Sequence, residues 1–424
     1  MPATTYPIYK RHCGWTSSDE IKRDSAALKG FQPCDAIIIG AGYTGLAIAQ
    51  RLAELCPEDD IRVIDAERIG KGSAGRNSGF LLEHAFAAKE PASAHSLHQH
   101  YHRAHQEISQ RASLPTLTAD SAKIFKGAAT ERGMNGLNAL AQLLEASYQP
   151  FEWLPQERMH EITGSSYYRA GILLPENRLL NPYKLIRSLA EQLPNNVRLH
   201  AQSPALAITQ HQGGWQVTTP EGVLQAPKVF LANNAFAKNL GYGQGHSVTI
   251  YTYAAITEPL APKERQQVMG EGQWGLLPAH RLGSTLRTTD DGRLLIRGMY
   301  GYEKEGGREV EQILQRSLQK RFPDLESAQS LARWWGGTTA LTSNGAPLWG
   351  ELKSGLYASI GCNGVGIIKG WMLGQELAQL ACNQSTLDIH GLFGKPGWIP
   401  PEPLRQLGFL AVSELEKNMA GNEK

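Results

Sequence analysis

The sequence predicts an α/β fold in which a doubly wound domain is interleaved with a second, α+β domain built on a mostly antiparallel sheet. Three observations point to this architecture. A strand, a glycine-rich turn, a helix and a second strand follow one another within residues 36–64. A strand, a glycine loop and a helix recur over residues 356–381. Between them lie further short strands, of which residues 214–226 alternate apolar and polar side chains.

The composition is that of an ordinary globular protein with room for two domains. The 424 residues are 41% hydrophobic and 19% charged, with 42 basic residues against 40 acidic ones. Because no block of lysine and arginine stands out, we expect no nucleic-acid partner. We also expect no secretory signal and no membrane span, since the apolar runs are too short. Five cysteines without CxxC spacing argue against disulfides and against a metal site, and favour a cytoplasmic location.

The first strand of the pattern is Ala36–Ile39, a β-branched run of the kind that is buried on both faces of a parallel sheet. Gly40, Gly42 and Gly45 follow it as a GxGxxG turn that opens a helix. The first glycine permits the tight turn, the second lets a pyrophosphate approach the backbone, and the third lets the helix pack on the strand. The helix N-terminus would then face the phosphates. These features predict a Rossmann-like dinucleotide-binding unit.

The choice of dinucleotide depends on the residues after the second strand, Ile61–Ile64. Asp65 ends that strand, about 20 residues past the last glycine, where a carboxylate bonds the ribose hydroxyls and disfavours NADP. Residues 70–80 (GKGSAGRNSGF) then form a second glycine-rich loop. A plain NAD domain has no role for this loop, whereas a flavin site can use its backbone N–H groups. We therefore predict FAD, with an NAD-dependent dehydrogenase as an alternative.

The rest of the chain divides into helices and short strands. Helical potential covers residues 95–112, 134–147 and 309–322. The strand-like runs are Val197–His200, Ala205–Thr209, Gly214–Thr219, Val223–Ala226, Val229–Ala232 and Leu356–Ile360, with a hairpin turn at residues 220–222. Since both ends of the chain contribute nucleotide-type strands, we expect discontinuous domains. The predicted division is an N-terminal arm (1–33), an FAD-binding domain (34–90, 150–235 and 335–385), a substrate domain (91–149 and 236–334) and a C-terminal extension (386–424).

Several motifs in this order resemble one known family. They are IIIGAGYTG, GSAGRNSG, VFLANNA, ITEPL, DGRLLIRG, RWWGGTTALTSNGAPLWG and GLYASIGCNGVGIIKG. The family is that of the FAD-dependent D-amino-acid-oxidase-like oxidoreductases, especially the glycine/sarcosine oxidase, pipecolate oxidase and γ-glutamylputrescine oxidoreductase branches. The resemblance covers residues 35–381. It implies a doubly wound FAD domain, a sheet-based substrate domain, and hydride removal from a carbon that bears an amine.

The resemblance also implies where the flavin lies and how it is held. The loop at residues 361–366 precedes a helix whose N-terminus would stabilise negative charge on the reduced ring. Relatives that bind FAD covalently have a cysteine where this chain has Thr338 and Thr339, so we expect non-covalent FAD. The predicted cofactor-binding residues are Gly40, Gly42, Tyr43, Thr44, Gly45, Asp65, Ala66, Gly72, Ser73, Arg76, Asn77, Ser78, Gly79, Ala232, Asn233, Gly361, Cys362, Asn363, Gly364, Val365, Gly366 and Ile367.

Three residues are our candidates for catalysis or substrate binding. Arg297, at the end of the run LLIR, is the first choice for a substrate carboxylate, with Arg76 and Lys369 behind it. His84 is one of several histidines between residues 84 and 105; it could face the ring, although a solvated helix position is the simpler interpretation. We expect no metal ligand.

The sequence thus predicts FAD-dependent oxidation of the C–N bond of a small amine or amino acid to an imine. The substrate would be a secondary or cyclic amino acid of the sarcosine or pipecolate type, or a γ-glutamylated polyamine. Oxygen or a quinone would accept the electrons. A non-catalytic flavin-binding subunit of a larger oxidase is a further alternative. Peripheral membrane contact could involve Leu404–Val412, for which a short helix on the protein's own surface is the simpler expectation.

Overall fold

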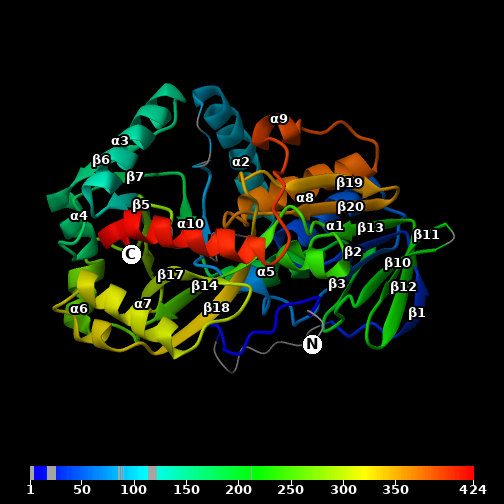
Figure 1. Cartoon of the computed structure of the whole chain (residues 1–424), viewed down its shortest axis with the longest axis horizontal. Helices are drawn as coiled ribbons and strands as arrows, with labels where there is room; N and C mark the ends of the chain where they lie inside the picture. Colours follow the sequence, from blue (N-terminus) through cyan, green and yellow to red (C-terminus); the bar gives the residue numbers. More distant parts are fainter. Residues whose placement is uncertain are drawn as a thin grey trace.

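The computed structural model describes residues 4–16, 25–84, 86, 88, 90–112, 122–211 and 213–424. Within these residues the chain forms a six-stranded sheet, an eight-stranded sheet, and smaller sheets of four and two strands. Figure 1 shows two lobes, one around each large sheet, with helix α10 (Leu404–Ala420) running from the middle of the molecule across the front of the lobe that contains the eight-stranded sheet. Segments far apart in the sequence therefore meet in both lobes.

The six-stranded sheet is the predicted parallel core. Its strand order is β19 (Leu348–Lys353), β20 (Leu356–Ile360), β13 (Lys228–Leu231), β2 (Ala36–Ile39), β3 (Ile61–Ile64) and β9 (Val197–His200). All neighbours are parallel except β19, which runs antiparallel to β20 at the edge. Every residue of β2 is buried, because Ala36 and Ile38 face the helical layer and Ile37 and Ile39 face the four-stranded sheet on the other side. This two-sided burial explains the continuous apolar run.

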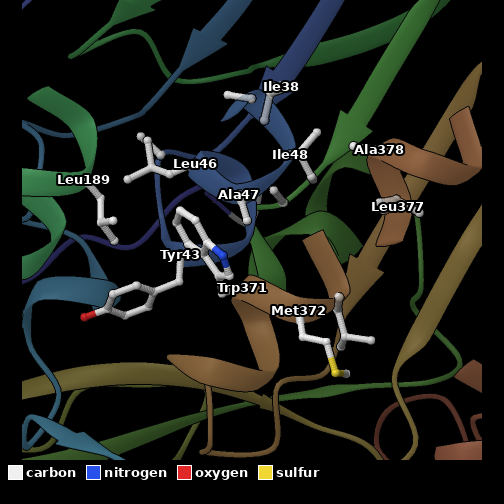
Figure 2. Close-up of a cluster of buried hydrophobic side chains, with 14 of the residues drawn as sticks. Ile38, Tyr43, Leu46, Ala47, Ile48, Leu189, Trp371, Met372, Leu377 and Ala378 are labelled. Carbon is white, nitrogen blue, oxygen red and sulfur yellow. The ribbon is translucent and has the colours of Figure 1, made fainter. Parts of the chain in front are cut away.

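Two helices cover one face of the parallel sheet and pack closely against each other. They are α1 (Tyr43–Leu55) and α8 (Ile368–Ala381). Figure 2 shows their shared core, with Leu46 and Ala47 of α1 beside Trp371 of α8. A Cβ on Gly374 would lie 2.5 Å from the carbonyl oxygen of Thr44, so only glycine permits this crossing. The helix after the C-terminal glycine loop is thereby fixed on the first helix of the chain.

The eight-stranded sheet forms the second lobe. Its strand order is β18 (Arg333–Leu341), β14 (Val248–Ile256), β17 (Leu294–Tyr302), β16 (Thr285–Thr288), β15 (Trp274–Pro278), β5 (Lys123–Ala128), β7 (Ala170–Leu173) and β6 (Glu152–Pro155). All these strand pairs are antiparallel except β15 and β5. Helix α7 (Arg308–Arg321) packs Val310, Leu314 and Leu318 on one face of the sheet. The opposite face is turned toward the dinucleotide-binding lobe, as the hydrogen bonds from Arg287 to the carbonyls of Ser78 and Gly79 show.

The remaining elements complete the two lobes. The four-stranded sheet contains β1 (Gly30–Pro33), β12 (Gly222–Ala226), β11 (Gly214–Thr218) and β10 (Ala207–His211), and the two-stranded sheet pairs β4 (Phe80–Leu81) with β8 (Arg178–Leu179). The other α-helices are α2 (Pro91–Arg111), α3 (Glu131–Ala146), α4 (Gln156–Thr163), α5 (Pro182–Glu191), α6 (Pro262–Met269) and α9 (Ile389–Phe393).

The sheets do not follow all of the predicted domain ranges, and the division of the chain into domains remains a prediction. Strands β6 and β7 and all of β18 except its first two residues fall in ranges that we assigned to the FAD-binding domain, yet all three strands belong to the eight-stranded sheet. Residues 30–33 of the expected irregular arm form β1, which pairs in parallel with β12. Short strands of two sheets can have the same apolar pattern, so periodicity alone does not show which sheet they join.

The C-terminal segment differs from the expected short helix packed on the surface. Helix α10 is 17 residues long, and Leu404, Leu407, Leu410 and Leu415 are each at least half exposed. In the described part of the chain, no helix combines the length and apolarity required to cross a membrane.

Candidate active site

The GxGxxG turn joins β2 to α1 with the geometry that the sequence predicts. Gly40 has φ +107°, in the region that favours glycine, and Gly42 is the N-cap of α1. A Cβ on Gly45 would lie 1.8 Å from the carbonyl oxygen of Gly40, so no side chain fits there. Gly40, Gly42, Tyr43 and Thr44 line a large cavity at this helix N-terminus. The unpaired N–H groups of the first helical turn are thus available to a phosphate.

Asp65 ends β3 at the edge of the same cavity. One carboxylate oxygen accepts a hydrogen bond of 2.7 Å from the N–H of Ala41, and the other accepts one of 2.9 Å from the N–H of Glu67. These bonds hold the glycine turn and the following loop together. Ala232 and Asn233, which follow β13 on the other side of β2, also line the cavity. The side-chain oxygen of Asn233 is buried without a hydrogen-bond partner in the described residues. A ligand with a hydrogen-bond donor would satisfy it.

The second glycine-rich loop is anchored by its side chains while its backbone borders the cavity. The hydroxyl of Ser73 hydrogen-bonds those of Thr338, at 2.6 Å, and Tyr9. The amide of Asn77 donates to the carbonyl of Ala74 at 2.6 Å. Gly72, Ser73, Asn77 and Ser78 all line the cavity, and nothing lies within 4 Å of where a Cβ on Gly72 would stand. The loop therefore presents open backbone to a ligand.

Arg76 lies in this loop but points away from the cavity. It is 5% exposed, and its guanidinium donates to the carbonyls of Gly336 and Arg11 while it stacks over the ring of Tyr9. The structure thus uses Arg76 to hold the loop against β18 and the N-terminal segment. Its predicted role as a reserve partner for a substrate carboxylate does not fit this position.

The C-terminal glycine loop closes another side of the same cavity. Gly361, Asn363 and Gly364 all have positive φ, and the side chain of Asn363 holds the loop by donating to the carbonyls of Gly345 and Gly361. The thiol of Cys362 lies 3.2 Å from the hydroxyl of Thr339 and 3.2 Å from the amide nitrogen of Asn234. Residues 361–367 line the cavity at the N-terminus of α8.

These segments surround one cavity of ≈ 2040 Å³. It extends from the GxGxxG turn and Asp65, past the two glycine loops, to the face of the eight-stranded sheet. A pocket for a single small ligand usually measures about 300–1,000 Å³. The cavity is therefore large enough for a dinucleotide together with a substrate.

Arg297 lies on the sheet side of this cavity. It is half-buried in the middle of β17, and its guanidinium stands 5.5 Å from the centre of the Tyr300 ring. Its side chain lines the cavity, and it forms no ion pair with any described residue. A half-buried guanidinium of this kind is suited to bind a ligand carboxylate in a bidentate manner.

Lys369 also lines the cavity, at the start of α8. Its ammonium group donates to the carbonyl of Gly345 at 3.2 Å and lies 4.4 Å from the centre of the Phe393 ring. Burial lowers the pKa of Lys369 to about 8. The side chain is therefore held by the cavity wall, on the opposite lobe from Arg297.

His84 differs from the expected solvated helix histidine. It follows β4 outside any helix, is 2% exposed, and lines the cavity. Burial, with a smaller contribution from His98, lowers the pKa of His84 to about 4, so the imidazole is neutral at neutral pH. Its Nδ1 is hydrogen-bonded to the Asn177 side chain, and its Nε2 is buried without a partner in the described residues.

The histidines of α2 have a different role from His84. His102 and His105 hydrogen-bond the carboxylate of Glu83, which is 1% exposed. Burial would raise the pKa of Glu83, but the hydrogen bonds from His105 and His102 outweigh it and lower the pKa. Glu83, His98 and Glu176 bring ligand-type atoms within 4.8 Å of one another, none of them on the cavity wall. These contacts fix α2 to the loop after β4.

Among the contributions to the cavity that sequence reasoning missed, two bear on the site. Lys126 of β5 is the first of them. The only sequence feature that could have indicated it is a lysine between two apolar residues, Ile124 and Ala128, on the same face of a strand. Both of these neighbours are buried. The C-terminal extension also lines the cavity, through Phe409 and Val412 of α10. Nothing in the sequence of the extension indicates where it crosses the fold.

The residues present fit FAD. The glycine turn, the backbone of the second loop and the acid at the end of β3 occupy one edge of a parallel sheet, which is the arrangement that binds a dinucleotide. The unsatisfied oxygen of Asn233 and the open backbone at Gly72 and Gly364 are on the wall of the same cavity. Asp65, the helix N-terminus and the three glycine-containing loops would hold the cofactor.

Comparison with known proteins agrees with this assignment. The chain is 26% identical over 385 residues to "Probable oxidoreductase OrdL" of Rhizobium meliloti, covering 85% of this chain and 86% of that protein. It is 25% identical over 375 residues to the γ-glutamylputrescine oxidoreductase of Escherichia coli, covering 82% of this chain and 83% of that protein. The crystal structure of glycine oxidase from Geobacillus kaustophilus matches the fold with a TM-score of 0.73 at 19% identity, covering 86% and 98% of the two chains. The model of the DAO family, described as FAD dependent oxidoreductase, matches residues 35–380, and the chain therefore belongs to this family of FAD-dependent oxidoreductases.

Proposed function

We propose that this protein uses FAD to oxidise the C–N bond of a small amine or amino acid to an imine. The observation that carries the proposal is the continuity of one cavity, which joins the dinucleotide cradle to Arg297 on the opposing sheet. A substrate carboxylate on Arg297 would place the rest of the molecule between the two lobes. The names of the relatives, a γ-glutamylputrescine oxidoreductase and a glycine oxidase, support an amine substrate.

The chain's own residues would orient the substrate and exclude water. FAD, when bound, accepts the hydride that leaves the carbon beside the nitrogen. Arg297 would neutralise the carboxylate, which could not be buried unpaired at acceptable cost. The amine loses its proton to solvent, and water hydrolyses the resulting imine to a carbonyl compound and an amine or ammonia. The Nδ1 of His84 accepts from the amide of Asn177, so in the neutral imidazole the proton is on Nε2. Because Nε2 has no partner among the described residues, it would donate one hydrogen bond to the substrate or cofactor.

The finer substrate class that we propose is the one expected from the sequence: a secondary or cyclic amino acid, or a γ-glutamylated polyamine. Oxygen or a quinone would reoxidise the flavin. A cytoplasmic location is supported by the five cysteines, all of which carry free thiols.

Product analysis tests the proposal. Purified holoenzyme is incubated with each candidate amine, with either oxygen or a soluble quinone as acceptor, and the carbonyl product and released nitrogen are quantified. For each carbonyl group formed we expect one ammonia molecule or one new primary amino group, which in the case of a cyclic amino acid stays on the ring-opened product. The acceptor that supports turnover identifies the reoxidation route. Carbonyl formation with neither ammonia nor a new amino group would instead indicate oxidation of a C–O bond, and the proposal would be wrong.

The mode of FAD attachment has its own test. Thr338 and Thr339 provide no thiolate or imidazole for a covalent bond, and the thiol of Cys362 is engaged with Thr339 and Asn234. We expect acid or heat denaturation of the yellow protein to release all of its flavin into the supernatant. Flavin that stays with the precipitated polypeptide would show a covalent link, and Cys362→Ser would then identify whether this thiol is its site.

A further inference from the structure

Lys126 is a second cation on the cavity wall. It belongs to β5, lines the same cavity as Arg297, and like Arg297 forms no ion pair with a described residue. Its ammonium group stands 4.6 Å from the centre of the Phe86 ring, which also lines the cavity. Two unpaired cations on one wall are costly unless a ligand neutralises them.

Strand register places the two cations in one row across the sheet. Arg297 of β17 is opposite Thr285 of β16. The pairing of Leu276 with Leu286 continues to place Thr285 beside Leu277 of β15. Leu277 is in turn opposite Lys126 of β5. Residues directly opposite one another share a face of the sheet, and all four of these side chains line the cavity.

The row has a charged group at each end and no charge between them. Three inter-strand steps of ~4.8 Å separate Lys126 from Arg297, which gives about 14 Å between their Cα atoms. Both side chains are long enough to reach several ångströms toward each other along the wall. The neighbouring residues of the row, Ile296, Leu286, Leu276 and Phe125, point to the opposite face and pack in the core under α7. The row is therefore a strip of the cavity wall with a cation at each end, and the sheet fixes the distance between the two cations.

The surroundings of Lys126 favour binding of an anion. Burial lowers the pKa of Lys126 to about 8, and no other group contributes to the shift. The adjoining wall is apolar, formed by Phe86, Leu82 and Leu277. A carboxylate beside the ammonium group would restore the interactions that burial has removed, and would do so in surroundings that strengthen the attraction.

We infer that Lys126 is a specificity-determining residue that binds a second carboxylate, so that the substrate is an amine with two carboxylate groups. One carboxylate binds Arg297, the other binds Lys126, and the amine lies between them. An N-carboxyalkyl amino acid or a dicarboxylic amino acid has this chemistry. The inference rests on the proposed function for the position of the amine, but the binding of two anions can be measured without turnover.

The test uses ligands that cannot be oxidised at a C–N bond. Dissociation constants of glutarate, adipate and pimelate are measured on the holoenzyme through their perturbation of the flavin spectrum, each against the monocarboxylate with the same number of carbons. The variants are Lys126→Met, which keeps the length of the side chain, and Lys126→Arg, which keeps its charge. The control is Lys123→Met, on the same strand but paired with Glu271 outside the cavity.

We expect the wild-type protein to prefer at least one dicarboxylate over its matched monocarboxylate by tenfold or more. Lys126→Met should abolish that preference, whereas Lys126→Arg and Lys123→Met should retain it. A wild-type protein without any preference, or a preference that survives Lys126→Met, would overturn the inference. Equal loss of all ligands in Lys126→Met, together with weaker FAD binding, would show that Lys126 serves the cofactor. Failure of every amine to reduce the flavin would contradict the proposed function. The ligand preference of the wild-type protein and of Lys126→Met would still decide whether Lys126 binds a carboxylate.

Discussion

Arg297 is the side chain on which recognition of an amino acid depends most directly. Its guanidinium is half-buried in the cavity wall and pairs with no described carboxylate. Arg297→Met should raise KM for an amino-acid substrate by well over tenfold, about 1.4 kcal/mol or more, because a buried carboxylate loses its bidentate partner. Steady-state kinetics on the amino acid and on its decarboxylated analogue provide the measurement.

The decarboxylated amine should be affected little, since it lacks the group that Arg297 binds. Arg308→Met, at an exposed position at the start of α7, is the control for loss of an arginine as such. Equal losses for both substrates in Arg297→Met would assign the residue to the fold or to the flavin, and would favour a polyamine-type substrate without a nearby α-carboxylate.

Single side chains near the substrate were the hardest features to predict. Arg297 could be named because it follows an apolar strand, and Asp65 because its spacing from GxGxxG is fixed by the βαβ unit. His84 could not be placed, because the short apolar run at residues 80–82 and the acid that follows this run do not distinguish a buried loop from a solvated helix. Lys126 gives a signal only after the face of its strand is known to border a cavity, which depends on residues more than 100 positions away.

Secondary-structure elements were predicted with more success where both local and tertiary constraints agree. The observed bounds of β2, β3, β9 and β20 equal the predicted ones. In β2, β3 and β20 every residue is buried, and their apolar runs end at a glycine or an acid that the cofactor site requires. Helix α10 was predicted too short, because the prediction followed the apolar run Leu404–Val412 and the helix continues through polar residues to Ala420. The leucines of that run were expected to pack on the protein, but they are exposed among the described residues. An element whose partners lie far away in the sequence gives no local sign of its ends.

The close packing of α1 on the turn after β2 requires a residue without a side chain at position 45, and this requirement can be tested. A Cβ there would lie 1.8 Å from the carbonyl oxygen of Gly40, so the turn must move if a side chain is added. Gly45→Ala should destabilise the fold by at least 1–3 kcal/mol, as overpacking roughly does, and should lower FAD occupancy because the phosphate-binding turn is displaced. Chemical denaturation and the flavin-to-protein ratio measure the two effects.

Gly408 provides the matched comparison, since it is also helical but has no atom within 4 Å of an added Cβ. Gly408→Ala should stabilise α10 slightly, by roughly 0.5–1 kcal/mol. If Gly45→Ala were as well tolerated as Gly408→Ala, with full flavin content, the predicted contact between turn and helix would be absent.

At the scale of the whole molecule, the C-terminal segment connects the two lobes. It runs from the dinucleotide-binding lobe to the lobe that contains the eight-stranded sheet (Figure 1). Phe409 and Val412 of α10 line the cavity on the way. Glu423, the penultimate residue of the segment, is 2% exposed. Its carboxylate accepts hydrogen bonds from the N–H groups of Ala129 and Thr130 and from the Thr130 hydroxyl. The extension is therefore anchored at its far end by a buried acid.

Glu423→Ala should destabilise the protein by roughly 1–3 kcal/mol, because it leaves three donors without their acceptor. Residues 386–424 should also become more sensitive to limited proteolysis. Glu414→Ala, in an exposed pair with Lys417, should change neither property measurably. The anchoring role of Glu423 would be refuted if the two variants behaved alike in both assays.

The central claim concerns the whole molecule: the cavity between the lobes holds FAD and brings an amine to it. Anaerobic mixing of the holoenzyme with a panel of amines, amino acids and amine dicarboxylates tests it most directly, with hydroxy acids of the same shape as controls. We predict that at least one amine bleaches the visible flavin band rapidly and completely, and that its hydroxy analogue does not. A flavin that no amine reduces, or that the hydroxy acids reduce as fast as the amines, would contradict the claim.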